Sequence, residues 1–187
     1  MDIIRNRLVK GFYNNIKIIT DKRDLYDDLT AELSDDEIDI SYYDDEMVAL
    51  DKVYNIETDL KKLFSRTVFL KSGGSLIVEP TEAMTVIDVN SGKAIKGKNA
   101  EASYLKINME AASQIARLLR VRNMSGIIII DFISMKDPES VKKLTEHMKS
   151  ELKKDEVKAL YVDMTPLGLV EITRKKITKP LTLDDFN

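Results

Sequence analysis

Met84-Thr-Val-Ile-Asp88 and Gly126-Ile-Ile-Ile-Ile-Asp131 are two short apolar runs, and each of them ends on an aspartate. Both runs are rich in β-branched residues, which favours strands. The segment between them is long enough for one substantial helix. A strand, a crossover helix and a second strand indicate an α/β fold, in which ligands bind at the edge of the sheet where the strands end. The stretch from Met84 to Asp131 therefore decides the fold that we predict.

The segment between these strands predicts a helix from about Ala100 to Arg122. Four apolar residues recur at helical spacing and predict a face directed at the core: Ile107, Ala111, Ile115 and Leu118. The last turns of the helix carry three arginines: Arg117, Arg120 and Arg122. These arginines either interact favourably with the helix C-terminus or form a phosphate-binding edge, and the sequence leaves both interpretations open.

Upstream of this unit the sequence predicts a smaller βαβα piece. We expect strands at 15–20 and 38–43, and helices at 21–33 and 56–65. Asp21 is a plausible N-cap of the first of these helices, because a carboxylate at that position can accept the free N–H groups of the first turn.

Two hairpins frame the central unit. Lys71-Ser-Gly-Gly74 predicts the first, and Thr165-Pro-Leu-Gly168 predicts the second, between strands at 159–164 and 169–173. A helix that begins after Asp137, its predicted N-cap, precedes the second hairpin. Four of its residues are expected to point inward: Val141, Leu144, Met148 and Leu152.

The composition narrows the class of protein. With 187 residues, of which 43% are hydrophobic, the chain can bury a sizeable core. One third of the residues are charged but the net charge is only −3, unlike a strongly basic nucleic-acid binder. No cysteine and a single histidine, His147, exclude thiolate and histidine-rich metal sites and leave oxygen ligands for magnesium, manganese or calcium. We find no signal peptide and no membrane-spanning run, so we expect a cytoplasmic protein.

The two strand-ending acids, Asp88 and Asp131, are the candidate site. Neighbouring strands lie about 4.8 Å apart, so carboxylates at the same edge of a sheet can share one divalent cation. Magnesium held in this way can activate water for attack on a phosphodiester. Asn90 would lie on the same side as Asp88, and Lys93 could hold a phosphate. A strand-ending aspartate is also a common turn former, and the pattern alone leaves both interpretations open.

Residues 73–181 resemble the catalytic core of the bacterial ribonuclease E/G family. The stretches that carry the resemblance occur in the family's order and at its spacing over more than a hundred residues, so the resemblance is specific. They are Gly73-Gly-Ser-Leu-Ile-Val, Thr81-Glu-Ala-Met-Thr-Val-Ile-Asp-Val-Asn-Ser-Gly, Asn108-Met-Glu-Ala-Ala, Gln114-Ile-Ala-Arg-Leu-Leu-Arg-Val-Arg, Gly126-Ile-Ile-Ile-Ile-Asp-Phe-Ile-Ser-Met and Gly168-Leu-Val-Glu-Ile-Thr-Arg-Lys-Lys.

The resemblance implies a fold and a reaction. It implies a pancreatic-deoxyribonuclease-like α/β subdomain at 73–187, preceded by part of a ribonuclease H-like subdomain at 1–72. It implies magnesium-dependent endonucleolytic cleavage of single-stranded RNA that leaves 5′-phosphate products. In the family the two strand-ending acids hold Mg²⁺, which assigns catalytic and metal-binding roles to Asp88 and Asp131 and a catalytic role to Asn90. The implied RNA-binding residues are basic: Lys93, Arg122, Arg174 and Lys175.

We expect this chain to be a fragment of a longer protein. Residues 2–11 have the pattern of a helix end without its beginning. The family's oligonucleotide-binding barrel and 5′-end sensor would precede Met1, and the cysteines of its zinc link would follow near Asn187. Neither is within the sequence, so the zinc-mediated homo-oligomer of the full-length family is not expected of this chain alone.

Two rival interpretations remain beside the endoribonuclease core. The first is a catalytically weak RNA-binding or assembly module that keeps the fold, which the near-neutral charge favours because RNA affinity rests on phosphate neutralisation. The second is a phosphate-responsive signalling domain of doubly wound type, with strand-ending acids around magnesium. The two predicted hairpins do not fit alternating β/α units, which counts against this second interpretation.

Overall fold

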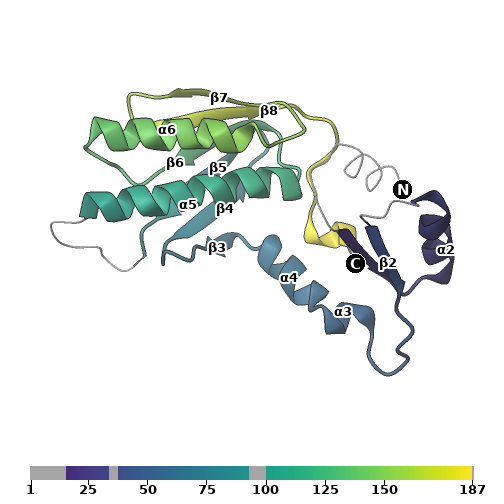
Figure 1. The fold of residues 1–187 in the computed structure, drawn as a ribbon. Coiled ribbons are helices and arrows are strands. Elements are labelled where there is room, and N and C mark those ends of the chain that lie inside the picture. The colour runs from purple at the N-terminus through teal and green to yellow at the C-terminus, as the bar shows by residue number, and fades with distance from the viewer. Residues whose placement is uncertain (1–15, 34–37, 93–99, 187) are drawn as a thin grey trace. The chain divides into compact units, whose positions relative to one another are not determined.

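The computed structural model describes residues 16–33, 38–92 and 100–186 (Figure 1). The chain divides into two compact units, Met1–Asp59 and Leu60–Asn187. Within the described ranges, no helix is both long enough and apolar enough to cross a membrane.

The N-terminal unit is a βαβ arrangement with one additional short helix. Its elements are β1 (Ile16–Thr20), α2 (Arg23–Glu32), β2 (Ile38–Tyr42) and α3 (Leu50–Val53). β1 and β2 pair in parallel, with Ile18 opposite Ile40. α2 crosses between them and packs on both strands, and its Leu29 is fully buried. Both predicted strands and the predicted crossover helix are confirmed.

The predicted N-cap of α2 is wrong. The helix begins at Arg23, and Lys22 occupies the N-cap position without a side-chain cap hydrogen bond. Asp21 is one residue too early to cap it. Instead, Oγ1 of Thr20 accepts a hydrogen bond from the backbone N–H of Lys22 at 3.1 Å, which shapes the turn into the helix. The expected helix end at residues 2–11 lies outside the described residues.

The C-terminal unit contains a six-stranded mixed sheet in the order β3-β4-β5-β6-β8-β7. β5 and β6 are parallel neighbours, whereas the other pairs are antiparallel. The strands are β3 (Thr67–Phe69), β4 (Ser75–Pro80), β5 (Met84–Asn90), β6 (Gly126–Asp131), β7 (Ala159–Met164) and β8 (Leu169–Arg174). The helices are α4 (Ile56–Leu63), whose first residues belong to the N-terminal unit, α5 (Ala100–Val121), α6 (Pro138–Leu152) and the 3₁₀ turn η1 (Leu183–Phe186).

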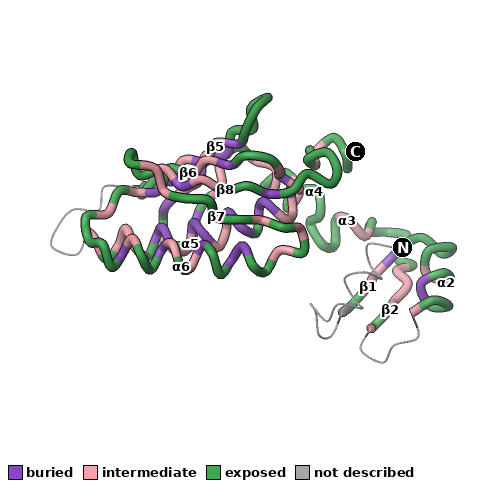
Figure 2. The backbone as a smooth tube through the Cα atoms, turned by 90° about the horizontal axis from the view of Figure 1, so that it is seen from above, coloured by how far each residue is buried: buried purple, intermediate pink, exposed green. Residues whose placement is uncertain are grey.

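α5 and α6 pack against each other and cover the same face of this sheet (Figures 1 and 2). The predicted stripe of α5 is buried, as are Leu144, Met148 and Leu152 of α6, while Val141 is half-buried. They meet the alternate strand residues that point the same way, such as Leu76, Ile87, Ile128 and Ile172, in one continuous core. Neither helix covers the opposite face of the sheet.

Both hairpins are confirmed, and they correct the predicted domain boundary. We expected the boundary before residue 73, but β3 pairs with β4 across the turn at 71–74, so a cut there would separate two paired strands. The compact C-terminal unit begins at Leu60 instead. The antiparallel pairs β3-β4 and β7-β8 also exclude a doubly wound parallel sheet, and with it the signalling-domain interpretation.

The C-terminal segment is attached near the end of α5. The backbone N–H of Leu181 donates to the carbonyl of Arg122 at 2.9 Å. The Asp185 carboxylate accepts from Nζ of Lys179 at 2.6 Å and from the backbone N–H of Thr182 at 2.8 Å. The hydrogen bond from Lys179, followed by those from Thr182, lowers the pKa of Asp185 from 3.8 to about 2.

We expect a pH-dependent release of this turn with a midpoint near pH 2. Because the pKa is lowered in the folded chain, the stabilising contribution of Asp185 is complete above pH 3.8 and is lost as the pH falls through about 2. An NMR titration of the Thr182 amide measures it, with Asp185→Asn as the control that lacks the transition. A midpoint at the ordinary aspartate pKa contradicts the expectation.

Candidate active site

Asp88 and Asp131 lie side by side at the ends of neighbouring strands. β5 and β6 are parallel, and their register pairs Met84 with Ile127 and Asp88 with Asp131. Paired positions on adjacent strands direct their side chains to the same face, with strands about 4.8 Å apart. The predicted adjacency of the two acids is therefore confirmed.

Both carboxylates lie on the face that the helices leave uncovered. Along β5 the buried residues are Thr85, Ile87 and Val89, and the last two flank the half-buried Asp88. Along β6, Ile130 is buried and the following Asp131 is exposed. Because successive strand residues point to opposite faces, the buried residues face α5 and α6 while the two acids point away from them. The acids are thus accessible to a ligand from solvent.

Asn90 is the third member of the cluster. It is two residues beyond Asp88 on β5 and shares its face, as the sequence predicts. Its Nδ2 donates a hydrogen bond to Oδ2 of Asp88 at 2.7 Å. The amide thus fixes one carboxylate oxygen without adding charge, and leaves the other oxygen free of this bond.

The two carboxylates suit Mg²⁺ better than a metal ion that needs all of its ligands from the protein. In the described part of the chain, no group of three or more histidine, cysteine, aspartate or glutamate side chains is arranged to hold a metal ion. Glu171 on β8 points to the same face but pairs with Ile129, not with the two aspartates. Two carboxylates are sufficient for Mg²⁺, which keeps several waters and takes further oxygens from a phosphate substrate.

The predicted basic residues are not gathered around this cluster. Lys93 lies outside the described residues. Arg122 is buried at the far end of α5, where its Nε and Nη2 donate to the carbonyls of Leu63 and Ser65 at 2.7 and 2.8 Å. Burial lowers the pKa of the Arg122 guanidinium. This side chain holds the connection between α4 and β3, and its burial counts against the predicted contact between Arg122 and RNA.

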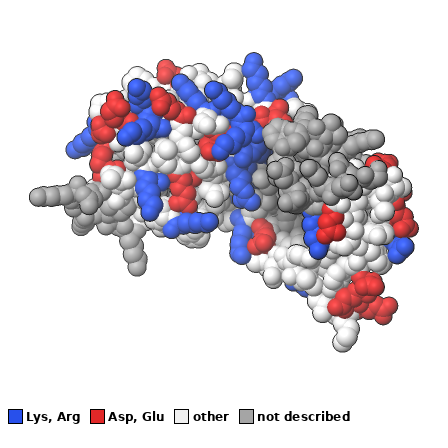
Figure 3. Space-filling view, viewed as in Figure 1, with Lys and Arg blue, Asp and Glu red and all other residues white. Residues whose placement is uncertain are grey.

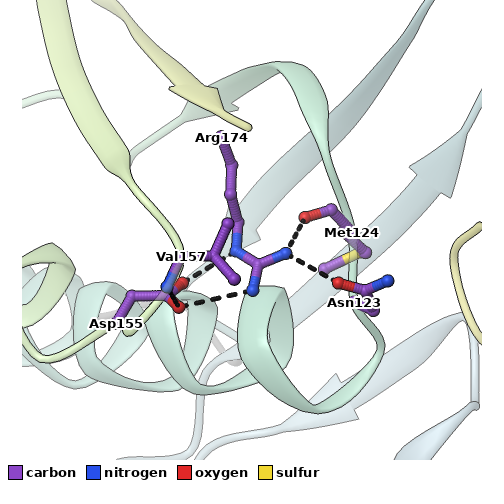
Figure 4. A network of polar contacts seen from close by, with 5 residues as sticks. All are labelled: Asn123, Met124, Asp155, Val157 and Arg174. Atoms are coloured by element: carbon purple, nitrogen blue, oxygen red, sulfur yellow. Dashed lines mark hydrogen bonds and ion pairs between the residues drawn. The ribbon is translucent and has the colours of Figure 1, made fainter. Parts of the chain in front are cut away.

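Arg174 is also buried, which counts against its predicted contact with RNA (Figure 4). Its Nε donates to Oδ2 of Asp155 at 2.7 Å and its Nη2 to Oδ1 of the same carboxylate at 3.3 Å. Its Nη1 donates to Oδ1 of Asn123 at 3.0 Å and to the carbonyl of Met124 at 3.1 Å. The guanidinium therefore joins β8 to the turn that follows α5 and to the segment before β7.

Lys175 is exposed, but it lies at the other end of the sheet. On β8, Leu169 pairs with Asp131, whereas Arg174 pairs with Gly126 at the beginning of β6. At about 3.4 Å per residue, Lys175 is roughly 20 Å along the sheet from the two aspartates.

On the helix-covered face, Lys and Arg side chains stand beside Asp and Glu side chains (Figure 3), so charges of both signs are present there.

Two polar residues of α5 that sequence reasoning did not single out contact the loops beside the cluster. The fully buried Asn108 donates from Nδ2 to the carbonyl of Ile133 at 2.8 Å and accepts from its N–H at 3.1 Å. Glu110 accepts from the N–H groups of Lys71 and Ser72. The sequence could have indicated them by their position, because both are polar residues directly beside the apolar stripe that contains Ile107 and Ala111.

Comparison with known proteins gives the family that this sequence matches. The sequence profile of the Ribonuclease E/G family matches residues 1–177. Ribonuclease G of Salmonella typhimurium is 43% identical over 124 residues, which are 66% of this chain and 25% of that protein. Ribonuclease E of Nostoc sp. is 42% identical over 123 residues, which are 66% of this chain and 18% of that protein.

Ribonuclease G of Haemophilus influenzae is 43% identical over 129 residues, which are 69% of this chain and 26% of that protein. The matched part of this chain thus spans about a quarter or less of the length of these relatives. The family profile, in contrast, covers nearly the whole chain, including both compact units. The chain belongs to the ribonuclease E/G family.

Proposed function

We propose that this chain is the core of a magnesium-dependent endoribonuclease that cleaves single-stranded RNA and leaves 5′-phosphate products. The observation that carries the proposal is the registered pair Asp88 and Asp131, with Asn90 bonded to Asp88, in a chain of the ribonuclease E/G family. Relatives named ribonuclease G and ribonuclease E support RNA as the substrate.

In this proposal each residue of the cluster has a distinct task. Asp88 and Asp131 would hold Mg²⁺, which supplies Lewis acidity and activation of water for attack on phosphorus. The Asn90 amide would orient the Asp88 carboxylate through Oδ2 and leave its other oxygen for the metal. The uncovered face of the sheet lets a single strand of RNA approach both acids. The bond between phosphorus and the 3′ oxygen breaks, which leaves the phosphate on the 5′ end of the downstream product.

The finer fold assignment belongs to the same proposal. We assign the C-terminal unit to a pancreatic-deoxyribonuclease-like subdomain, supported by its mixed sheet with acids on the uncovered face. We assign the N-terminal βαβ arrangement to part of a ribonuclease H-like subdomain. We assign to Lys175 a contact with the RNA backbone away from the scissile bond, supported by its exposure and its distance from the acids.

The test is cleavage of a 5′-phosphorylated, fluorescently labelled single-stranded RNA by the 187-residue chain. We expect cleavage with millimolar Mg²⁺ and none after chelation. A DNA strand of the same sequence and the RNA annealed to its complement serve as substrate controls. Ligation of an adaptor to the downstream product, without prior phosphorylation, reports its 5′-phosphate. Equal cleavage with and without Mg²⁺ contradicts the proposed chemistry.

The second candidate function is an RNA-binding or assembly module without appreciable activity. The net charge of −3 and the burial of Arg122 and Arg174 favour weak RNA affinity and therefore weak cleavage, since RNA affinity rests on exposed cations. Fluorescence anisotropy with the same RNA separates the two candidates. Saturable binding without Mg²⁺-dependent cleavage supports the module, whereas cleavage supports the endoribonuclease.

A further inference from the structure

α5 reaches both sides of the candidate active site with polar side chains. Successive helix residues are rotated by about 100°, so Asn108 and Glu110 are about 200° apart and lie on opposite flanks of the stripe that carries Ile107 and Ala111. That stripe packs on the sheet. One polar side chain bonds to the loop after β6, and the other bonds to the β3-β4 turn.

Glu110 holds the β3-β4 turn through its carboxylate. One oxygen accepts from the N–H of Lys71 at 2.6 Å and the other from the N–H of Ser72 at 2.9 Å. Burial raises the pKa of Glu110, but the hydrogen bonds from Ser72 and Lys71 outweigh it, so the pKa lies below its ordinary value. Each of the two carboxylate oxygens therefore accepts one backbone hydrogen bond from the turn.

The turn held by Glu110 lies directly against the backbone of Asn90. A Cβ atom added to Gly74 would lie 2.7 Å from the Asn90 carbonyl oxygen and 2.8 Å from Cγ2 of Ile107, so only glycine fits at this position of the turn. Ser75, the next residue, pairs with Asn90 across β4 and β5. We therefore expect a displacement of the turn to move Asn90, whose Nδ2 is bonded to the Asp88 carboxylate.

Asn108 holds the loop after β6, as Glu110 holds the β3-β4 turn. Its amide forms two hydrogen bonds with the peptide groups of Ile133, as a neighbouring strand would. Ile133 is two residues beyond Asp131, and the intervening Phe132 is buried in the core. The backbone that carries Asp131 is thus fixed to the same helix as the backbone that carries Asn90.

We propose that Asn108 and Glu110 are positioning residues of the active site: α5 uses them to set the relative placement of Asp131 and of the Asn90–Asp88 pair. The proposal deepens, and rests on, the proposed endoribonuclease function. Neither residue is assigned a contact with RNA or metal. Their task is to keep the carboxylates in the geometry that cleavage needs, and small displacements of such groups are costly for rate.

Glu110→Gln is the primary test, because it keeps the size of the side chain and replaces one acceptor oxygen with an amide that cannot accept. We expect the cleavage rate at saturating RNA to fall about 10- to 100-fold with KM changed less than about twofold. Gly74→Ala perturbs the same turn from the opposite side and is expected to act in the same direction. Asn108→Ala leaves two backbone groups of the half-buried Ile133 without their partner, so its stability is measured before its activity.

The decisive readout needs neither RNA nor metal. In ¹⁵N-labelled chain, the side-chain amide resonances of Asn90 are expected to shift in Glu110→Gln and in Gly74→Ala. Asp185→Asn is the matched control, because its carboxylate also accepts a backbone N–H, that of Thr182, but in the segment attached to the far end of α5. It should leave both the Asn90 resonances and the cleavage rate unchanged.

Each outcome bears on one of the two proposals. Unshifted Asn90 resonances in both folded variants overturn the positioning role, whatever the activity. A cleavage rate within twofold of the unchanged chain in Glu110→Gln overturns it as well. Shifted resonances in a chain that never cleaves RNA support the positioning role and refute the endoribonuclease function, so the two failures are distinguishable.

Discussion

Replacing Arg174 with alanine is expected to destabilise the C-terminal unit by about 3–5 kcal/mol. The side chains of Arg174 and Asp155 are each only 3% exposed and form an ion pair at 2.7 Å. Removing the guanidinium leaves the Asp155 carboxylate buried without its cation, and it also removes donors from Asn123 and the Met124 carbonyl. A buried charge left without its partner is far more costly than a lost surface contact.

Urea unfolding of the purified variant measures this loss. Arg66→Ala is the matched control, since Arg66 pairs with Glu79 on the same sheet but the two side chains are 68% and 49% exposed. We expect that control to lose less than about 1 kcal/mol. A loss below 1 kcal/mol in Arg174→Ala contradicts the structural role. At temperatures where the variant is folded, its RNA binding should keep an unchanged salt dependence, because Arg174 neutralises no phosphate.

The sequence predicted the central strand–helix–strand unit correctly because the signals there are local and repeated. Two β-branched runs and a long apolar stripe specify β5, α5 and β6, and parallel pairing then brings Asp88 and Asp131 into register. The domain boundary could not be read in the same way. It depends on which strands pair, and the pairing of β3 with β4 joins segments on both sides of a glycine turn that looked like a break.

The burial of Arg122 and Arg174 could have been predicted from the periodicity of the sequence. Arg174 follows Val170 and Ile172 at a spacing of two, so it points into the core with them. Arg122 lies four residues after the buried Leu118, one turn along the same face of the helix. In both cases the basic motif suggested RNA, whereas the phase of the strand or helix indicated burial. What the sequence could not provide is the partner: Asp155 and the Leu63 and Ser65 carbonyls are distant along the chain.

Asp88→Asn and Asp131→Asn are each expected to reduce Mg²⁺-dependent RNA cleavage by about 100-fold or more. Loss of one anionic ligand removes several kcal/mol of transition-state stabilisation, and about 3 kcal/mol corresponds to a factor of 100. The fold should remain. Asp131 is exposed, and an asparagine at position 88 still offers an oxygen to the Asn90 amide. Removing one of two adjacent like charges also relieves repulsion.

Asp163→Asn is the matched control for these two variants, because Asp163 is an exposed aspartate of the same sheet that pairs with Glu171 rather than with the cluster. Cleavage rates, Mn²⁺ binding by electron paramagnetic resonance and thermal unfolding are measured on all four chains. The proposal requires that both cluster variants lose cleavage and bind Mn²⁺ more weakly while all three variants unfold at similar temperatures. Full activity in both cluster variants rules out the metal site. Two carboxylates on an uncovered sheet face have little packing to lose, so we expect no large loss of thermal stability. Such a loss would instead indicate a structural role for these aspartates.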